Sequence, residues 1–425
     1  MKKIITSLFL NWQQALISIF VGALLVRGVF IFTLQARYYF PDSVEYSQAA
    51  VNLLTRAELG EGYDRPPGYP VFLASIYLFF GESILAVRMF ESVMGAFLAV
   101  VIALLSRRVG GEGVGVLAGI LWSIYPMGVF IVGLVYPTNL LTMLLACGLL
   151  CFVPDSQQEL SAKRVFFAGI VWGIAALTTP VVLATVGAIS LWVMCWSRAN
   201  RLLLVAVLFL GLALTVVPWI IRDFYVYDRL VVVEPRVVEH LPQMDKTKNN
   251  VPENKIEAIL KHPRVFAERY AREFKRFWLP YPERLVMDWP TVREKAHERD
   301  RRIVKDTIFT KNILINAVGI LTTGPLFLFA IIGTAAMWFQ REQRRDLALL
   351  LAIILSFPAV YSIFYAKMRY RIPVEPYIII LSAYGIKKTW DVLLLKKFDV
   401  RGSKFEVEVK AEAMVGDVRG SKFEV

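Results

Sequence analysis

Long apolar stretches alternate with short polar connections along most of the chain. A helix of about 20 apolar residues crosses the roughly 30 Å hydrocarbon core of a bilayer, and tilt changes the length it needs. The pattern therefore predicts an all-α polytopic membrane protein with about ten transmembrane helices. We expect these spans at about residues 15–34, 84–106, 113–133, 137–153, 164–180, 181–196, 202–220, 313–338, 346–364 and 372–390.

Basic residues in the short connections predict the orientation, since Lys and Arg in such loops are enriched on the cytoplasmic side. With ten spans, most of these residues fall on one face: Lys2, Lys3, Arg107, Arg108, Lys163, Arg164, Arg198, Arg201, Arg341, Arg344, Arg345, Lys387 and Lys388. The count requires that the apolar stretch Gly68–Phe80 does not cross, and its shortness suits an interfacial or re-entrant helix. Residues 35–83 and 221–312 then share the external face.

Composition agrees with a membrane protein, because 56% hydrophobic residues and a mean hydropathy of +0.53 are too apolar for a soluble globule. The net charge of +13 partly reflects the basic cytoplasmic loops. Anionic membrane lipids are therefore its expected partner, and nucleic acid is not. The first apolar stretch lacks an evident cleavage site and is expected to act as a signal anchor. Short loops and a compact tail favour the cytoplasmic (inner) membrane of a bacterium.

The pattern divides the chain into four regions. They are an N-terminal transmembrane module (1–220) whose first external loop is 35–83, an external or periplasmic cap (221–312), C-terminal transmembrane helices (313–390) and a cytoplasmic tail (391–425). Within the cap, Val265–Trp278 predicts an amphipathic helix that could lie along the membrane surface. The tail contains Asp399–Val407 and repeats it as Asp417–Val425. We expect no catalytic role for this polar repeat.

Ionisable residues gather in the first external loop, at the edge of the low-dielectric membrane. Asp42 and Glu45 follow the first span, and Asp64 and Arg65 precede a Pro-Pro step. Such groups are costly to hold there, which makes them functional candidates. Asp42 and Glu45 are three residues apart and could share one helical face. A solvated position at the rim is the alternative for Glu45.

Cations also gather on the external side in front of the last predicted span. Lys367, Arg369 and Arg371 break the cytoplasmic preference there, which indicates an anionic partner. That partner is either lipid phosphate or the phosphate of a substrate, whose oxygens a guanidinium matches bidentately. Arg88, at the external end of the second span, is either a further functional cation or an ion-pair partner of Glu91 or Glu82.

The order of these features resembles the GT-C glycosyltransferase superfamily. The most similar branch comprises dolichyl-phosphate-mannose protein mannosyltransferases and bacterial aminoarabinose transferases. The resemblance covers about residues 15–390. It rests on the external Asp loop, Arg65 before Pro-Pro, Ala86–Phe90, Pro218–Asp223 and Arg369–Pro373. It implies a GT-C-like helical bundle with interfacial helices in the first external loop and a small external cap.

The resemblance also implies a function. The protein would be a hexosyl- or pentosyltransferase that moves a sugar from a polyprenyl-phosphate carrier, with inversion, to a lipid, glycan or protein acceptor on the external face. Asp42 would be the general base, and Arg65 the first ligand of the donor phosphate. Members of this branch often carry a carboxylate just after Tyr136, where this chain has none. Glu45 is therefore the candidate for the second acidic residue.

The remaining residues match the pattern of the family less closely. Asp64 matches the acidic residue before the base-Pro-Pro element. Arg369 and Arg371 match a cationic motif before a late span, and Arg88 is a further candidate ligand of the donor phosphate. Some relatives use a divalent ion, which would bridge Asp42 and a phosphate. The chain's own histidines are too widely spaced for a recognisable zinc site: His240, His262 and His297.

Two other functions have similar sequence features. A multispan transporter or flippase of a lipid-linked or anionic substrate would also combine many spans with basic cytoplasmic loops. Transporters, however, usually bind near the midplane and contain topological repeats, and no such repeat is evident. An O-antigen ligase or polymerase would share a large external loop, but the early Asp loop and the Arg-Pro-Pro order argue against it.

Overall fold

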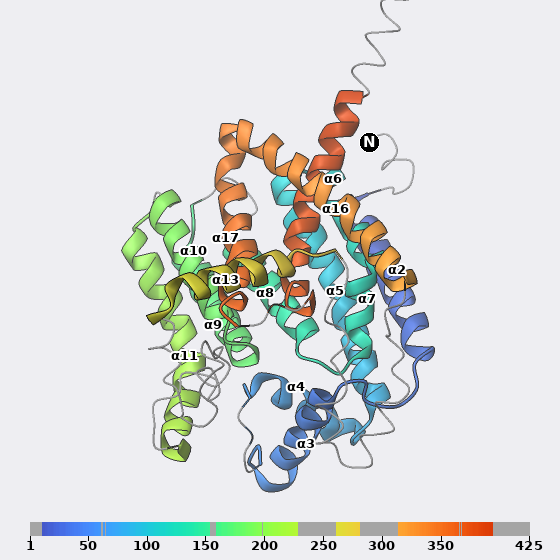
Figure 1. The fold of residues 1–425 in the computed structure, drawn as a ribbon, viewed down its shortest axis with the longest axis vertical. Coiled ribbons are helices and arrows are strands. Elements are labelled where there is room, and N and C mark those ends of the chain that lie inside the picture. Colours follow the sequence, from blue (N-terminus) through green and yellow to red (C-terminus); the bar gives the residue numbers. More distant parts are fainter. Residues whose placement is uncertain are drawn as a thin grey trace, which may run out of the picture.

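The computed structural model describes residues 11–60, 63, 65–153, 159–197, 199–227, 261–280, 313–364, 366 and 368–393. The regular structure in these ranges is helical (Figure 1). Its elements are α2 (Trp12–Phe32), α3 (Pro41–Arg56), α4 (Gly68–Phe80), α5 (Ile84–Gly110), α6 (Glu112–Ile124), α7 (Pro126–Phe130), η1 (Ile131–Gly133), α8 (Thr138–Phe152), α9 (Ala162–Thr178), α10 (Val182–Trp196), α11 (Arg201–Tyr227), α13 (Pro263–Phe277), α16 (Ile313–Phe339), η2 (Arg341–Gln343), α17 (Arg344–Tyr361), η3 (Met368–Tyr370) and η4 (Ile372–Val374). A last helix covers residues 375–393.

Four of the described helices are long and apolar enough to cross a membrane: α2, α5, α11 and α16. A fifth candidate span consists of two parts, α6 and the stretch formed by α7 and η1. The second part is bent by 55° relative to the first. Pro126 begins α7 at this bend, and proline cannot continue the hydrogen-bond ladder of the preceding helix. The chain is therefore an integral membrane protein with several apolar helices.

The predicted helices are confirmed, whereas the count of ten spans stays a prediction. Each of the ten predicted stretches is largely helical, but α8 and α10 have 15 residues each and α9 has 17. Such helices are shorter than the usual length of a span. The stretch predicted not to cross forms α4, which has 13 residues. The four-region division also stays a prediction, because most of the cap and the repeated tail lie outside the described residues.

The helices form a bundle with a separate lobe at one end (Figure 1). The lobe contains α3 and α4, and α13 crosses the face of the bundle at a large angle to the long helices. One apolar core runs through the bundle from α5, α6 and α8 to α17 and the last helix. A second, smaller core joins α3 and α4 to Val87 and to the turn that holds Val135 and Tyr136. This second core positions the candidate site.

The contact between α9 and α11 depends on two glycines that face each other. A Cβ atom at Gly169 would collide with the carbonyl oxygen of Leu208, and one at Gly211 would collide with the carbonyl oxygen of Phe166. Small residues let membrane helices approach this closely. We expect Gly211→Val to lower the free energy of unfolding by about 1–3 kcal/mol, because a rigid backbone has to move.

The thermal-unfolding midpoint in detergent measures this effect. Gly187→Val in α10 is the matched control, since no atom lies within 4 Å of a Cβ built at Gly187. Equal midpoints for the two variants would show that the α9–α11 contact is not tightly packed.

Candidate functional site

Asp42 lies in the first turn of α3, which the local sequence begins sharply. Phe40 is extended and Pro41 occupies the first helical turn, where proline is tolerated because no hydrogen bond of the helix is lost. An acidic residue in this turn is also favoured by the helix dipole. Glu45 follows three residues later, so that both carboxylates reach the same side of α3, as the sequence predicts.

Arg65 joins the two carboxylates of α3. Its Nη2 atom lies 3.2 Å from Oδ1 of Asp42, and its Nε atom lies 2.8 Å from Oε2 of Glu45. The guanidinium also lies 5.4 Å from the ring centroid of Tyr46, which α3 presents between them. The side chains of Asp42 and Arg65 are 22% and 23% exposed, whereas Glu45 is 53% exposed. Glu45 therefore lies at the outer edge of this group.

Arg369 reaches the same carboxylate from the other end of the chain. Its Nη2 atom lies 3.4 Å from Oδ2 of Asp42, and its guanidinium lies 4.7 Å from the ring centroid of Tyr136. Its Nε atom is buried and has no hydrogen-bond partner within the described ranges. The structure thus places Asp42 between two arginines that are far apart in the sequence. Asp42, Glu45, Arg65 and Arg369 are the predicted site residues that it brings together.

Tyr136 is a member of this group that the sequence did not identify. Its hydroxyl donates a hydrogen bond of 2.7 Å to Oδ2 of Asp42. The preceding Val135 has a φ of 52°, a left-handed conformation that is costly for a β-branched residue and that often marks functional sites. Ser43 of α3 holds this turn through a 2.9 Å hydrogen bond to the carbonyl oxygen of Leu134.

Burial and charge fix the protonation states of this group. Burial raises the pKa of Tyr46 to about 12, against the opposing effect of Arg65, and burial raises the pKa of Tyr136 further. Burial alone would lower the pKa of Arg65 and of Arg369, but the neighbouring tyrosines and Asp42 raise both above their usual values. Both tyrosines therefore remain hydroxyl donors at neutral pH, and both arginines remain charged.

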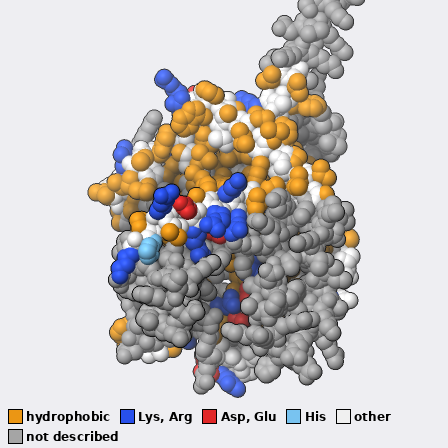
Figure 2. All heavy atoms as spheres, in the orientation of Figure 1, with side chains coloured by type: hydrophobic (Ala, Val, Ile, Leu, Met, Phe, Trp, Pro, Cys, Tyr) orange, Lys and Arg blue, Asp and Glu red, His pale blue; other side chains and the backbone are white. Residues whose placement is uncertain are grey.

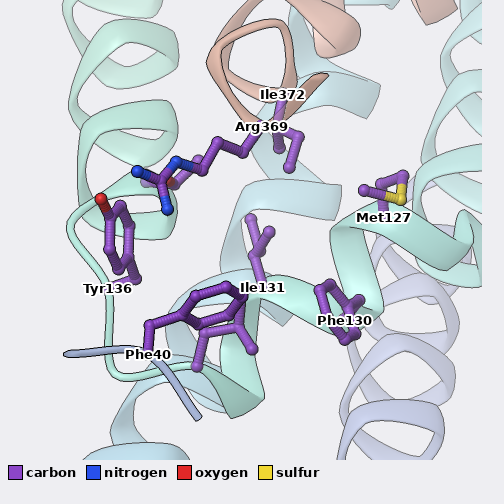
Figure 3. A pocket seen from close by; sticks show the side chains of 9 residues that line it. Phe40, Met127, Phe130, Ile131, Tyr136, Arg369 and Ile372 are labelled. Carbon is purple, nitrogen blue, oxygen red and sulfur yellow. The ribbon is translucent and has the colours of Figure 1, made fainter. Parts of the chain in front are cut away.

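An apolar pocket opens beside Arg369 and Tyr136. Figure 3 shows these two side chains pointing toward each other at one side, with hydrocarbon side chains around the rest. The cavity volume is small in this structure, about 20 Å³. Besides these two residues, it is lined by Phe40, Met127, Phe130, Ile131, Leu134, Thr138 and Ile372. Such a combination suits a ligand with a charged group attached to an apolar chain.

In Figure 2, basic side chains form a band across the face of the molecule, below an apolar upper part. Acidic and basic side chains are visible inside a hollow below this band. The band lies over α13, whose bounds Pro263–Phe277 agree closely with the predicted amphipathic helix.

Two of the predicted phosphate ligands are not part of this group. Arg88 donates to the backbone oxygens of Gly133, Gln35 and Arg37 over 2.8–3.0 Å, and it pairs with neither Glu91 nor Glu82. In this structure Arg88 ties α5 to two connections, and its role as a phosphate ligand stays a prediction.

Arg371 is likewise engaged within the chain. It is fully buried, and its Nε atom lies 2.9 Å from Oε1 of Glu375. Its Nη1 atom donates to the carbonyl oxygens of Phe277 and Leu279 at the end of α13. In this structure Arg371 anchors α13, and its role as a phosphate ligand stays a prediction. Asp64, the remaining predicted residue, lies outside the described residues.

The acidic side chains of the site bear on whether it could hold a metal ion. Within the described part of the chain, no group of three or more His, Cys, Asp or Glu side chains is arranged to hold one. Asp42 and Glu45 both face Arg65, which already neutralises part of their charge. The described residues therefore do not fit a divalent ion, and we derive no step through one.

Known protein families and solved structures show what the chain is similar to. Residues 64–221 match the model of a family described as dolichyl-phosphate-mannose-protein mannosyltransferase. This segment is similar to that family. The match begins at the Asp64-Arg65-Pro-Pro element and ends within α11, at residue 221. No curated protein is significantly similar in sequence to the chain.

Two solved structures are similar in fold to most of this chain. ArnT from Cupriavidus metallidurans, bound to undecaprenyl phosphate, aligns with a TM-score of 0.55 and 15% identity over 91% of this chain and 63% of its own. The oligosaccharyltransferase AglB from Archaeoglobus fulgidus, in complex with an inhibitory peptide and a dolichol-phosphate, aligns with a TM-score of 0.53 and 16% identity. That match covers 91% of this chain and 52% of AglB. The chain therefore shares its fold with both proteins but spans only part of their length.

Proposed function

We propose that the protein is a membrane glycosyltransferase that moves a sugar from a polyprenyl-phosphate carrier to an acceptor on the external face of the membrane. The family of residues 64–221 is named for a dolichyl-phosphate-linked sugar. Two proteins with this fold have been seen with undecaprenyl phosphate and with a dolichol-phosphate. The proposal includes the predicted orientation in a bacterial inner membrane, with α3 and α4 outside.

One observation carries the proposal: a carboxylate held between two arginines beside an apolar pocket. Sugar transfer from a phosphate carrier needs a base for the acceptor hydroxyl and positive charge for the leaving phosphate. Asp42 supplies the first, and Arg65 with Arg369 the second. The apolar pocket would take the first part of the polyprenyl chain and would hold the phosphate near Arg369.

The reaction follows from these positions. The phosphate of the donor would bind Arg369, including its buried Nε atom, and would compete with Asp42 for the guanidinium groups. The acceptor oxygen would attack the anomeric carbon, and the bond from that carbon to the phosphate oxygen would break. The acceptor proton would pass to Asp42, and polyprenyl phosphate would leave with the bonding electron pair. Attack opposite the leaving group inverts the anomeric carbon.

Release of free polyprenyl phosphate tests the function. Purified protein in lipid nanodiscs is incubated with a panel of polyprenyl-phosphate sugars and a membrane extract as the source of acceptors. We expect release from one class of donor, and that donor names the sugar. No release from any donor, together with movement of a lipid-linked substrate in sealed vesicles, would instead indicate a transporter or flippase.

A further inference from the structure

A fully buried acid of the candidate membrane span α5 lies next to residues that pack against the candidate site. Glu91 is 0% exposed. Its Oε1 atom accepts a 3.0 Å hydrogen bond from the hydroxyl of Tyr69, and its Oε2 atom accepts one of 2.6 Å from Nδ2 of Asn139. Both donors are neutral. Because a carboxyl group is costly to bury in a membrane span without a cation, such a residue calls for a functional explanation.

The first partner of Glu91 leads to Arg65. Tyr69 lies in the first turn of α4, shortly after Arg65 and the Pro-Pro step. Its ring packs edge-on against Tyr46, with centroids 5.4 Å apart and planes at 86°. Tyr46 is the ring over which the guanidinium of Arg65 lies. The hydrogen bond from Tyr69 to Glu91 therefore holds the Tyr69 ring in place. Tyr46 packs against this ring, and the guanidinium of Arg65 lies over Tyr46.

The second partner leads to Asp42 by a separate route. Asn139 lies in the first turn of α8, three residues after Tyr136. Its Nδ2 atom also donates to the backbone oxygen of Glu91 over 2.9 Å, so that the side chain is held at two points. Tyr136 in turn donates to Asp42. Glu91 thus connects α5 to two segments. One is the start of α4, where Tyr69 packs against the Tyr46 ring beside Arg65, and the other is the start of α8, which follows the Tyr136 that contacts Asp42.

A carboxyl group suits this place better than an amide. Both oxygens of Glu91 accept hydrogen bonds, whereas glutamine offers one oxygen and would turn an NH₂ group toward a donor. If Asn139 rotated to compensate, it would lose its bond to the backbone of Glu91. A glutamine here keeps the size of the side chain but weakens one of its two connections: with its NH₂ group toward Tyr69, that hydroxyl can only accept, and its own proton loses the carboxylate partner.

We propose that Glu91 is a positioning residue for the sugar transfer: through Tyr69 and Asn139 it sets the placement of Arg65 and of the Tyr136 hydroxyl relative to Asp42. The proposal rests on the proposed function for its effect on turnover. Glu91 itself touches neither donor nor acceptor, because it is enclosed by α4, α5 and α8.

The first test is the kinetics of Glu91→Gln. We expect kcat to fall about 10- to 100-fold, since small misplacements of reacting groups cost rates of this size, while the KM for the donor changes less than about threefold. Ser92→Ala is the matched control, because Ser92 is the next buried residue of α5 and its hydroxyl makes no hydrogen bond within the described ranges. Tyr69→Phe keeps the ring and removes one donor, and we expect a smaller loss. It also serves if Glu91→Gln does not fold.

A double-mutant cycle separates positioning from general destabilisation. If Glu91 acts through Tyr136, the loss of kcat in Glu91→Gln combined with Tyr136→Phe will be smaller than the product of the two separate losses. A multiplicative combination would overturn the proposal, and so would a wild-type kcat in Glu91→Gln.

A measurement that does not need activity keeps the proposal separate from the proposed function. In Glu91→Gln, hydrogen exchange should become faster both in residues 65–70 and in residues 134–139, and it should stay unchanged in Ser92→Ala. If the wild type releases no polyprenyl phosphate, the proposed function fails. Unchanged exchange in either segment refutes the positioning role, whatever the activity.

Discussion

Asp42→Asn should lower turnover by about 10²-fold or more, because the acceptor hydroxyl loses the group that takes its proton. Asparagine keeps the shape of Asp42 and can still accept the hydrogen bond from Tyr136, so the fold of the loop should survive. It also removes the anion that competes for Arg65 and Arg369, and donor binding should stay equal or become tighter. Release of polyprenyl phosphate and binding of the donor, measured on the same preparation, check both parts.

Glu45→Gln is the matched control on the same helix. Glu45 also pairs with Arg65, but it is more exposed and does not contact Arg369 in the described structure. An exposed ion pair contributes little, and we expect a loss of turnover well below that of Asp42→Asn. Near-normal turnover in Asp42→Asn would remove Asp42 from the mechanism. Equal losses in both variants would point to Arg65, their common partner.

Arg369→Ala should weaken binding of polyprenyl phosphate by about 10- to 100-fold, which is the usual effect of losing hydrogen bonds to a charged group. Arg369 is 17% exposed and lies at the mouth of the apolar pocket, where little water competes with the ligand. Arg369→Lys should recover only part of the affinity, since an ammonium group cannot reproduce the planar guanidinium. Binding can be measured with the carrier lipid alone, without turnover.

Arg272→Ala provides a control for charge alone. Arg272 is an exposed residue of α13, and its removal lowers the net charge by the same amount without changing the site. Wild-type affinity in Arg369→Ala would contradict a phosphate-binding role. A similar loss in Arg272→Ala would show that the whole basic face, rather than the pocket, attracts the lipid.

The local parts of the fold and site follow from the sequence. Apolar stretches locate the helices, and the spacing of Asp42 and Glu45 places both on one side of α3. Which arginines join them depends on tertiary packing. Arg369 and Arg371 are two residues apart, yet one faces Asp42 and the other lies buried against Glu375. The spacing of charges alone does not distinguish these two positions.

Tyr136 was missed for a related reason. The resemblance implies a carboxylate after this tyrosine, which the chain lacks, whereas the tyrosine itself is the residue that contacts Asp42. Its direction depends on the left-handed Val135, a conformation that residue preferences argue against. A tyrosine next to proline at the start of a helix was the available signal, and it is a weak one.

The placement of Asp42 between the two arginines also bears on how a catalytic cycle would end. A phosphodiester donor carries one negative charge, and the phosphomonoester product carries up to two. The proton taken up by Asp42 compensates for this difference, so the total charge near the arginines stays constant during the transfer. When Asp42 then gives its proton to water, it becomes an anion again and displaces the product from Arg65 and Arg369. Departure of the spent carrier would therefore be coupled to the loss of that proton.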